Sequence, residues 1–171
     1  MKVTFQGNPL TLLGSQIKVG DEFPDFTVMK TDLSQLTFDD TSGVRIFLAV
    51  PSIDTPVCDL EVITFNNRIS EIPGVSIYTI SMDLPFAQAR WCGANKVEAI
   101  QTVSDYKDRS FGEETGTLID ELGLLTRAAF VVDPAGSVVH VEYLEEITDQ
   151  PNFDAILAAA KSLGSYRVSN C

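Results

Sequence analysis

The order of apolar and polar residues along the chain predicts strands alternating with helices. Residues 44–50 form a short apolar run, rich in β-branched residues and bounded by Gly43 and Pro51, which is typical of a buried strand. Residues 75–81 alternate with a period of two, as a strand does. Strands are therefore predicted at residues 44–50, 75–81, 100–103, 128–132 and 137–141, with shorter extended pieces near 26–28 and 36–38.

Helices and turns fill the segments between these strands. Apolar residues at helical spacing predict helices over residues 58–69, 85–92 and 152–163, with Gly93 and Gly164 ending the last two. A short helix or loop is expected at residues 108–112. Two hairpins are predicted, one joining residues 2–6 to 10–13 through Gly7-Asn8-Pro9 and one joining 128–132 to 137–141.

This order of elements predicts an α/β fold with a mixed central sheet flanked by helices and an N-terminal β-hairpin. With 171 residues, 44% of them hydrophobic, the chain suits one domain whose core needs no disulfide framework. No repeat, low-complexity segment or linker divides it. A single domain over residues 1–171 is expected.

The charge balance excludes two classes of partner. Twelve basic residues stand against twenty-four acidic ones, which gives a net charge of −12. A chain this acidic is repelled by phosphate backbones and by anionic membrane surfaces, so neither nucleic acid nor a membrane is expected as a partner.

The N-terminal residues lack the apolar segment of a signal peptide, and no apolar run approaches the length of a membrane span. We therefore expect a cytoplasmic protein in which Cys58, Cys92 and Cys171 are reduced unless a disulfide forms as part of function. The cysteines form no close pair and His140 is the only histidine, so no metal site is expected. His140 is assigned no role.

Cys58 follows the first buried strand at the start of a helix. Thr55 is expected at the N-cap and Pro56 at the first helical position, where its missing N–H group costs nothing. Cys58 then lies in the first turn, near unpaired backbone N–H groups and the positive end of the helix dipole. A thiolate is stabilised there, so the segment favours a reactive cysteine over one that only packs.

Two neighbouring carboxylates, Asp59 and Glu61, oppose a thiolate at Cys58, so a compensating cation is needed. Arg127 is the candidate because it stands between apolar runs at the entry to a predicted strand, although a structural ion pair or an exposed strand end would equally explain it. Cys92 ends the second helix beside Trp91, and a bond to Cys58 would require Cα atoms within about 7 Å or loosening of the helix ends. Cys171, the last residue, is expected to be incidental.

Five segments in this order resemble the peroxiredoxins, and most closely the bacterial thiol peroxidase subfamily with two cysteines in one chain. Pro51, Thr55 and Cys58 reproduce the family signature Pro-x-x-x-Thr-x-x-Cys. The resemblance rests on Val3–Leu13, Pro51–Cys58, Asp83–Cys92, Ser104–Gly112 and Leu124–Ala128. It covers about residues 1–165 and leaves the short extension Tyr166–Cys171 unmatched.

The resemblance implies a thioredoxin-like fold and a peroxidase that reduces hydrogen peroxide and organic hydroperoxides without a cofactor. Cys58 would be the peroxidatic cysteine, which becomes a sulfenic acid, and Cys92 would resolve it as an intramolecular disulfide that a thioredoxin-type reductant recycles. Thr55 would orient the peroxide, Arg127 would stabilise the developing charge and Pro51 would shield the site from water. A homodimer is also implied.

Two alternatives remain open on the residues. A thioredoxin-like disulfide exchanger is disfavoured because no Cys-x-x-Cys follows the first strand. A non-enzymatic redox sensor that signals through a Cys58–Cys92 disulfide would share the same cysteines, and only catalytic cycling with a reductant distinguishes it from a peroxidase.

Overall fold

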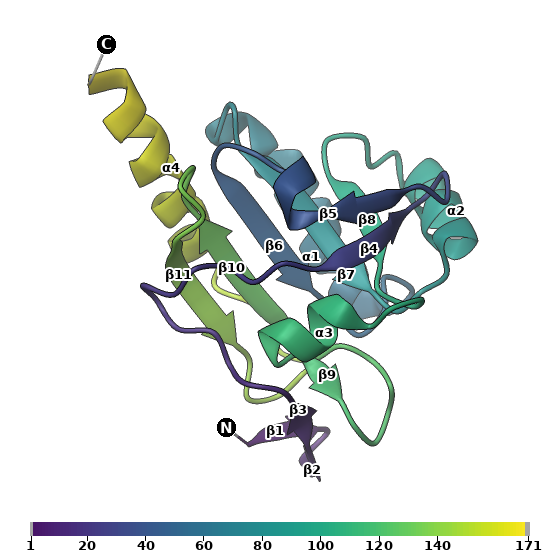
Figure 1. Cartoon of the computed structure of the whole chain (residues 1–171). Helices are drawn as coiled ribbons and strands as arrows, with labels where there is room; N and C mark the ends of the chain where they lie inside the picture. Colours follow the sequence, from purple (N-terminus) through teal and green to yellow (C-terminus); the bar gives the residue numbers. More distant parts are fainter. Residues whose placement is uncertain (1, 170–171) are drawn as a thin grey trace.

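The computed structural model describes residues 2–169, arranged around one seven-stranded sheet (Figure 1). The strands are β1 (Val3–Phe5), β2 (Asn8–Leu10), β3 (Leu12–Leu13), β4 (Thr27–Lys30), β5 (Gln35–Thr37), β6 (Arg45–Ala49), β7 (Ser76–Ser81), β8 (Gln101–Ser104), β9 (Leu118–Ile119), β10 (Ala128–Val132) and β11 (Val138–Tyr143). The helices are α1 (Pro56–Arg68), α2 (Pro85–Asn95), α3 (Ser110–Thr115) and α4 (Phe153–Ser169), with 3-10 turns η1 (Phe38–Asp40) and η2 (Ile69–Glu71).

The large sheet has the strand order β11-β10-β6-β7-β8-β4-β5. Strands β6, β7 and β8 run parallel, because α1 and α2 connect them as crossovers. β10 is antiparallel to β6, β11 is antiparallel to β10, and β4 is antiparallel to β8. The predicted mixed sheet is confirmed.

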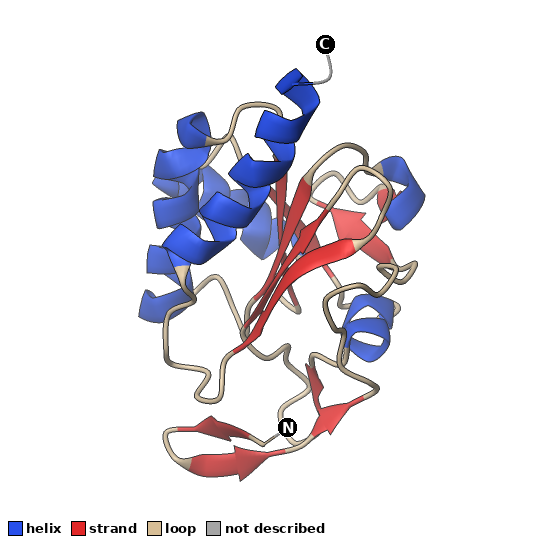
Figure 2. Cartoon of the chain, turned by 90° about the vertical axis from the view of Figure 1, so that its left-hand side faces the viewer, coloured by secondary structure: helices blue, strands red, loops and turns tan. Residues whose placement is uncertain are grey.

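Alternate residues of the central strands face two separate cores. Ile46 and Leu48 of β6 face the core beneath α1, α2 and α4, whereas Phe47 and Ala49 face the opposite core, to which α3 contributes Phe111. Figure 2 shows the sheet nearly edge-on between these layers. All five residues of β6 are buried, which explains why its sequence is a continuous apolar run apart from Arg45.

The N-terminal hairpin forms, but with a tighter turn than predicted. β1 pairs with β2 around Gln6 and Gly7, whose φ angles of 50° and 82° are typical of the turns that match strand twist. Leu12 and Leu13 do not continue the hairpin, because they pair instead with β9. β9 was not predicted, since two residues are too few for a periodic pattern.

Both predicted glycine ends of helices are wrong. α2 passes Gly93 and ends at Asn95, with Lys96 in the left-handed conformation, and α4 passes Gly164 and reaches Ser169. A glycine inside a helix costs only about 1 kcal/mol relative to alanine, so neighbouring contacts easily override it. α4 thus takes in part of the predicted extension 166–171, and Cys171 lies outside the described residues.

Candidate active site

The segment between β6 and α1 places Cys58 in the first turn of its helix. Thr55 has the extended backbone of an N-cap, and its Oγ1 accepts a hydrogen bond from the Cys58 backbone N–H at 3.2 Å. Pro56 occupies the first helical position, as its sequence predicts. Pro51, at the other end of the loop, is buried two residues after β6 ends. The end of this loop is therefore set by local helix-capping interactions.

Arg127 lies against the Cys58 sulfur although the two are far apart in sequence. Its Nη2 donates a hydrogen bond to Cys58 Sγ at 3.0 Å, and both side chains are buried. Nε of the same guanidinium donates to the Ile147 carbonyl at 2.8 Å. The guanidinium is therefore held in one orientation beside a sulfur that water does not reach.

Glu61 shares this guanidinium, a role that the sequence analysis did not foresee. Its Oε2 accepts a hydrogen bond from Arg127 Nη1 at 2.5 Å, one helical turn after Cys58. Burial raises the pKa of the Glu61 carboxyl to about 7, and the adjacent Arg127 limits that rise. Oε1 has no partner. The three-residue spacing from Cys58 on one helix face was the signal that could have identified Glu61.

Asp59, the other acidic neighbour of Cys58, is hydrogen-bonded to helix α2. Its Oδ1 accepts a hydrogen bond from the indole N–H of Trp91 at 2.8 Å. This bond links the first turn of α1 to the middle of α2, directly beside Cys92. Asp59 and Glu61 were expected to oppose a thiolate at Cys58. In the structure each carboxyl group accepts a hydrogen bond of its own, Asp59 from Trp91 and Glu61 from Arg127.

Asp83 holds the loop before Cys58, and sequence reasoning missed it. It accepts hydrogen bonds from Ser52 Oγ at 2.7 Å, from Ile53 N at 2.9 Å and from Ser81 Oγ at 2.6 Å. Asp83 stands at the end of β7, just before α2. One carboxylate thus joins the loop that leads to Cys58 to the segment that leads to Cys92.

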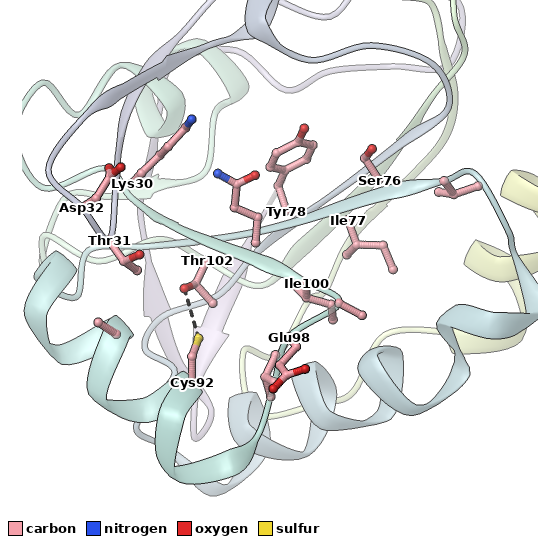
Figure 3. A pocket seen from close by; sticks show the side chains of 15 residues that line it. Lys30, Thr31, Asp32, Ser76, Ile77, Tyr78, Cys92, Glu98, Ile100 and Thr102 are labelled. Carbon is pink, nitrogen blue, oxygen red and sulfur yellow. Dashed lines mark hydrogen bonds between the residues drawn. The ribbon is translucent and has the colours of Figure 1, made fainter.

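The structure does not bring Cys92 to Cys58, and both are free thiols. Cys92 lies inside α2, half-buried, with its Sγ at 3.3 Å from Thr102 Oγ1 on β8 (Figure 3). β8 is three strand spacings, or about 14 Å, from β10, the strand that Arg127 precedes. A cavity of about 650 Å³ opens beside Cys92.

A second cavity, of about 430 Å³, lies between the Cys58 loop and α2. Ile53 and Trp91 give it apolar walls, and Arg90 and Asp83 add charge. Val57 and Phe86, each close in sequence to one of the two cysteines, do not line it, and Phe86 is 69% exposed.

The described residues were searched for a metal site and for a membrane-spanning helix. Among residues 2–169, no three histidine, cysteine, aspartate or glutamate side chains are grouped so that they could bind a metal ion. No helix in that part of the chain is long and apolar enough to cross a membrane.

The chain is similar to one family over most of its length. Residues 18–157 match the Redoxin family. The thiol peroxidase of Clostridium acetobutylicum is 60% identical over 162 residues, covering 95% of this chain and 99% of that protein. The thiol peroxidase of Bacillus subtilis is 49% identical over 163 residues, covering 95% and 98%.

Solved structures agree with the predicted thioredoxin-like fold. A peroxiredoxin-like protein from Aquifex aeolicus superimposes with a TM-score of 0.89 at 38% identity, covering 95% of this chain and 96% of that one. A thiol peroxidase from Chromobacterium violaceum has a TM-score of 0.85 with the same coverage. At 21% identity, that second match supports the fold alone.

Proposed function

The chain belongs to the redoxin family as a peroxiredoxin of the thiol peroxidase type, and we propose that Cys58 is the cysteine that attacks the peroxide. The observation that carries this proposal is the hydrogen bond from Arg127 Nη2 to Cys58 Sγ at 3.0 Å in a buried site. A buried cation and a capped helix N-terminus stabilise a thiolate over a thiol. We propose that residues 1–171 work as one peroxiredoxin domain.

In the first step the Cys58 thiolate attacks one oxygen of the peroxide and the O–O bond breaks. Cys58 becomes a sulfenic acid, and the other oxygen takes up the proton that the Cys58 thiol released on ionising and leaves as water or an alcohol. Arg127 supports the charge that grows on the oxygens, because its position is set before the reaction by Glu61 and Ile147. Thr55 orients the peroxide, and Pro51 keeps water from the sulfur.

In the second step Cys92 attacks the sulfenic sulfur and water leaves, which gives an intramolecular disulfide. Cys92 is hydrogen-bonded to Thr102, and Cys58 is hydrogen-bonded to Arg127. The helix ends therefore have to move before the two sulfurs can meet. A thioredoxin-type protein then restores both thiols by exchange. Cys171 takes no part.

The finer assignments follow from the resemblance and from the apolar surface around the site. We infer that organic hydroperoxides are substrates alongside hydrogen peroxide, because Ile53 and Trp91 line the cavity beside the Cys58 loop. A cytoplasmic location and a homodimer are also proposed, the latter to be tested by sedimentation of the reduced protein.

Peptide mapping under non-reducing conditions tests the two cysteine roles together. Pre-reduced protein that receives one equivalent of cumene hydroperoxide is expected to form a Cys58–Cys92 linkage within one chain. Cys58→Ser is expected to consume no peroxide, whereas Cys92→Ser is expected to reduce one equivalent and then fail to cycle with thioredoxin. Oxidation that spares Cys58 would refute the assignment.

A further inference from the structure

The N-terminal hairpin of β1 and β2 is a separate two-stranded sheet at one end of the molecule (Figure 1). The match to the Redoxin family begins only at residue 18, so the hairpin lies outside the segment matched to that family. The two reaction steps proposed for the cysteines make no use of it. Its contacts with the rest of the chain nevertheless lead to Arg127.

The hairpin pairs with the segment that follows β11. Thr4 N donates to the Glu145 carbonyl at 2.7 Å, and the Thr4 carbonyl accepts a hydrogen bond from Ile147 N at 3.0 Å. These two bonds form a parallel bridge between Thr4 and Glu146. Val3, next to the bridge, is fully buried. β1 is therefore held along this segment by main-chain bonds and by a buried side chain.

The Glu146 side chain joins the two sides of the bridge. Its Oε1 accepts hydrogen bonds from Gly7 N at 2.9 Å and from Thr4 Oγ1 at 3.1 Å, both in the hairpin. Its Oε2 accepts from Thr148 N at 2.9 Å and from Thr148 Oγ1 at 2.8 Å. Burial disfavours the charged carboxyl, but these four bonds outweigh it and lower the pKa of Glu146 to about 2. Glu146 is therefore a charged acceptor at neutral pH.

The segment held by the hairpin also holds Arg127. Leu144 N donates to the Arg127 carbonyl at 3.0 Å, and Arg127 Nε donates to the Ile147 carbonyl at 2.8 Å. Ile147 thus bonds to Thr4 through its N–H group and to Arg127 through its carbonyl. A guanidinium is planar and rigid, so a shift of the acceptor at Nε also turns Nη2, which lies 3.0 Å from Cys58 Sγ.

The two acceptors that orient Arg127 are fixed in different ways. Glu61 lies on α1, where Val62 and Phe65 are fully buried in the core. Ile147 lies in the segment between β11 and α4, outside any helix or strand. The main-chain bond to the hairpin therefore matters for where the Ile147 carbonyl lies.

We propose that the N-terminal hairpin positions Arg127 for the reaction at Cys58, with Thr4 and Glu146 as the positioning residues. This inference rests on the proposed role of Cys58. The charge that grows on the peroxide oxygens is stabilised best by a donor that is oriented before the reaction. Rate falls steeply when such a donor is misplaced by about 1 Å, even through a change far from the chemistry.

Glu146→Ala tests the proposal because it detaches the hairpin without touching the groups around the sulfur. Hydrogen exchange of the Ile147 amide should speed up. Oxidation of Cys58 by cumene hydroperoxide, followed by stopped-flow fluorescence, should slow about tenfold, which is part of the loss expected when the donor is removed altogether.

Glu145→Ala is the matched control, because it removes the same charge one residue away. Glu145 is exposed, and within residues 2–169 it hydrogen-bonds to the hairpin only through its main-chain carbonyl. The exchange of the Ile147 amide and the rate of Cys58 oxidation should both stay near those of the unchanged protein.

A double-mutant cycle separates positioning from a general loss of stability. If the hairpin acts through Arg127, Glu146→Ala slows oxidation in the unchanged protein and has no further effect in the Arg127→Met background. Equal slowing in both backgrounds, an Ile147 amide that exchanges as slowly as before, or a Glu146→Ala rate within about twofold of the unchanged protein overturns the inference while leaving the peroxidase intact. A Cys58→Ser variant that still consumes peroxide would instead refute the proposed function.

Discussion

Replacing Arg127 by methionine separates the two duties of its guanidinium, which are to compensate Glu61 and to support charge at Cys58. Both Arg127 and Glu61 are almost completely buried, and each loses its opposite charge when the other is removed. Breaking a buried pair by removing one partner costs about 3–5 kcal/mol of unfolding free energy. We expect the lower end of that range for Arg127→Met, because the Glu61 pKa is already raised to about 7 and the carboxyl can take up a proton.

The double variant Glu61→Met with Arg127→Met removes the unpaired carboxyl as well. Its unfolding free energy is expected to return to within about 1 kcal/mol of the unchanged protein, because well-packed apolar residues replace buried ion pairs at little net cost. The rate of Cys58 oxidation should remain about 10²–10³-fold low in both variants, since a fixed donor at the developing charge contributes that much.

Two measurements on the same samples distinguish these effects. Urea unfolding gives the stability, and stopped-flow fluorescence of Trp91, the single tryptophan, follows oxidation after peroxide is mixed with reduced protein. Recovery of the rate in the double variant would show that Arg127 acts only through stability. A rate for Arg127→Met within about fivefold of the unchanged protein would refute charge stabilisation at Cys58 altogether.

Three further substitutions test the parts around this pair. Glu61 has a folded-state pKa raised from 4.5 to about 7, so its contribution to stability is greatest below pH 4.5 and declines up to pH 7; Glu61→Gln should flatten unfolding free energy measured across that window. Thr55→Val should cost about 1 kcal/mol of unfolding free energy by removing the cap, whereas Thr55→Ser should not. Asp83→Asn should cost about 1–3 kcal/mol and slow Cys58 oxidation by loosening the loop, an idea that an unchanged melting temperature would contradict.

Local patterns were sufficient where neighbours in sequence are neighbours in space. The start of α1 depends on Thr55 as N-cap and on Pro56 at the first helical position, and these contacts lie within one helical turn. The local order of residues was therefore enough to predict them. The strands β6 and β10 were equally readable, because burial on both faces leaves a continuous apolar run. The ends of α2 and α4 were not, since the cost of a glycine is small beside tertiary packing.

Contacts between distant segments were decided only by the tertiary structure. The sequence could name Cys58 and Arg127, but only the folding of β10 beside β6 places Arg127 Nη2 at 3.0 Å from the sulfur. The same packing pairs Glu61 with Arg127, joins Asp59 to Trp91 and keeps Cys92 at Thr102. The physical reason is that periodicity and capping act over a few residues, whereas the partner of a buried charge is whichever group the fold brings within hydrogen-bond distance.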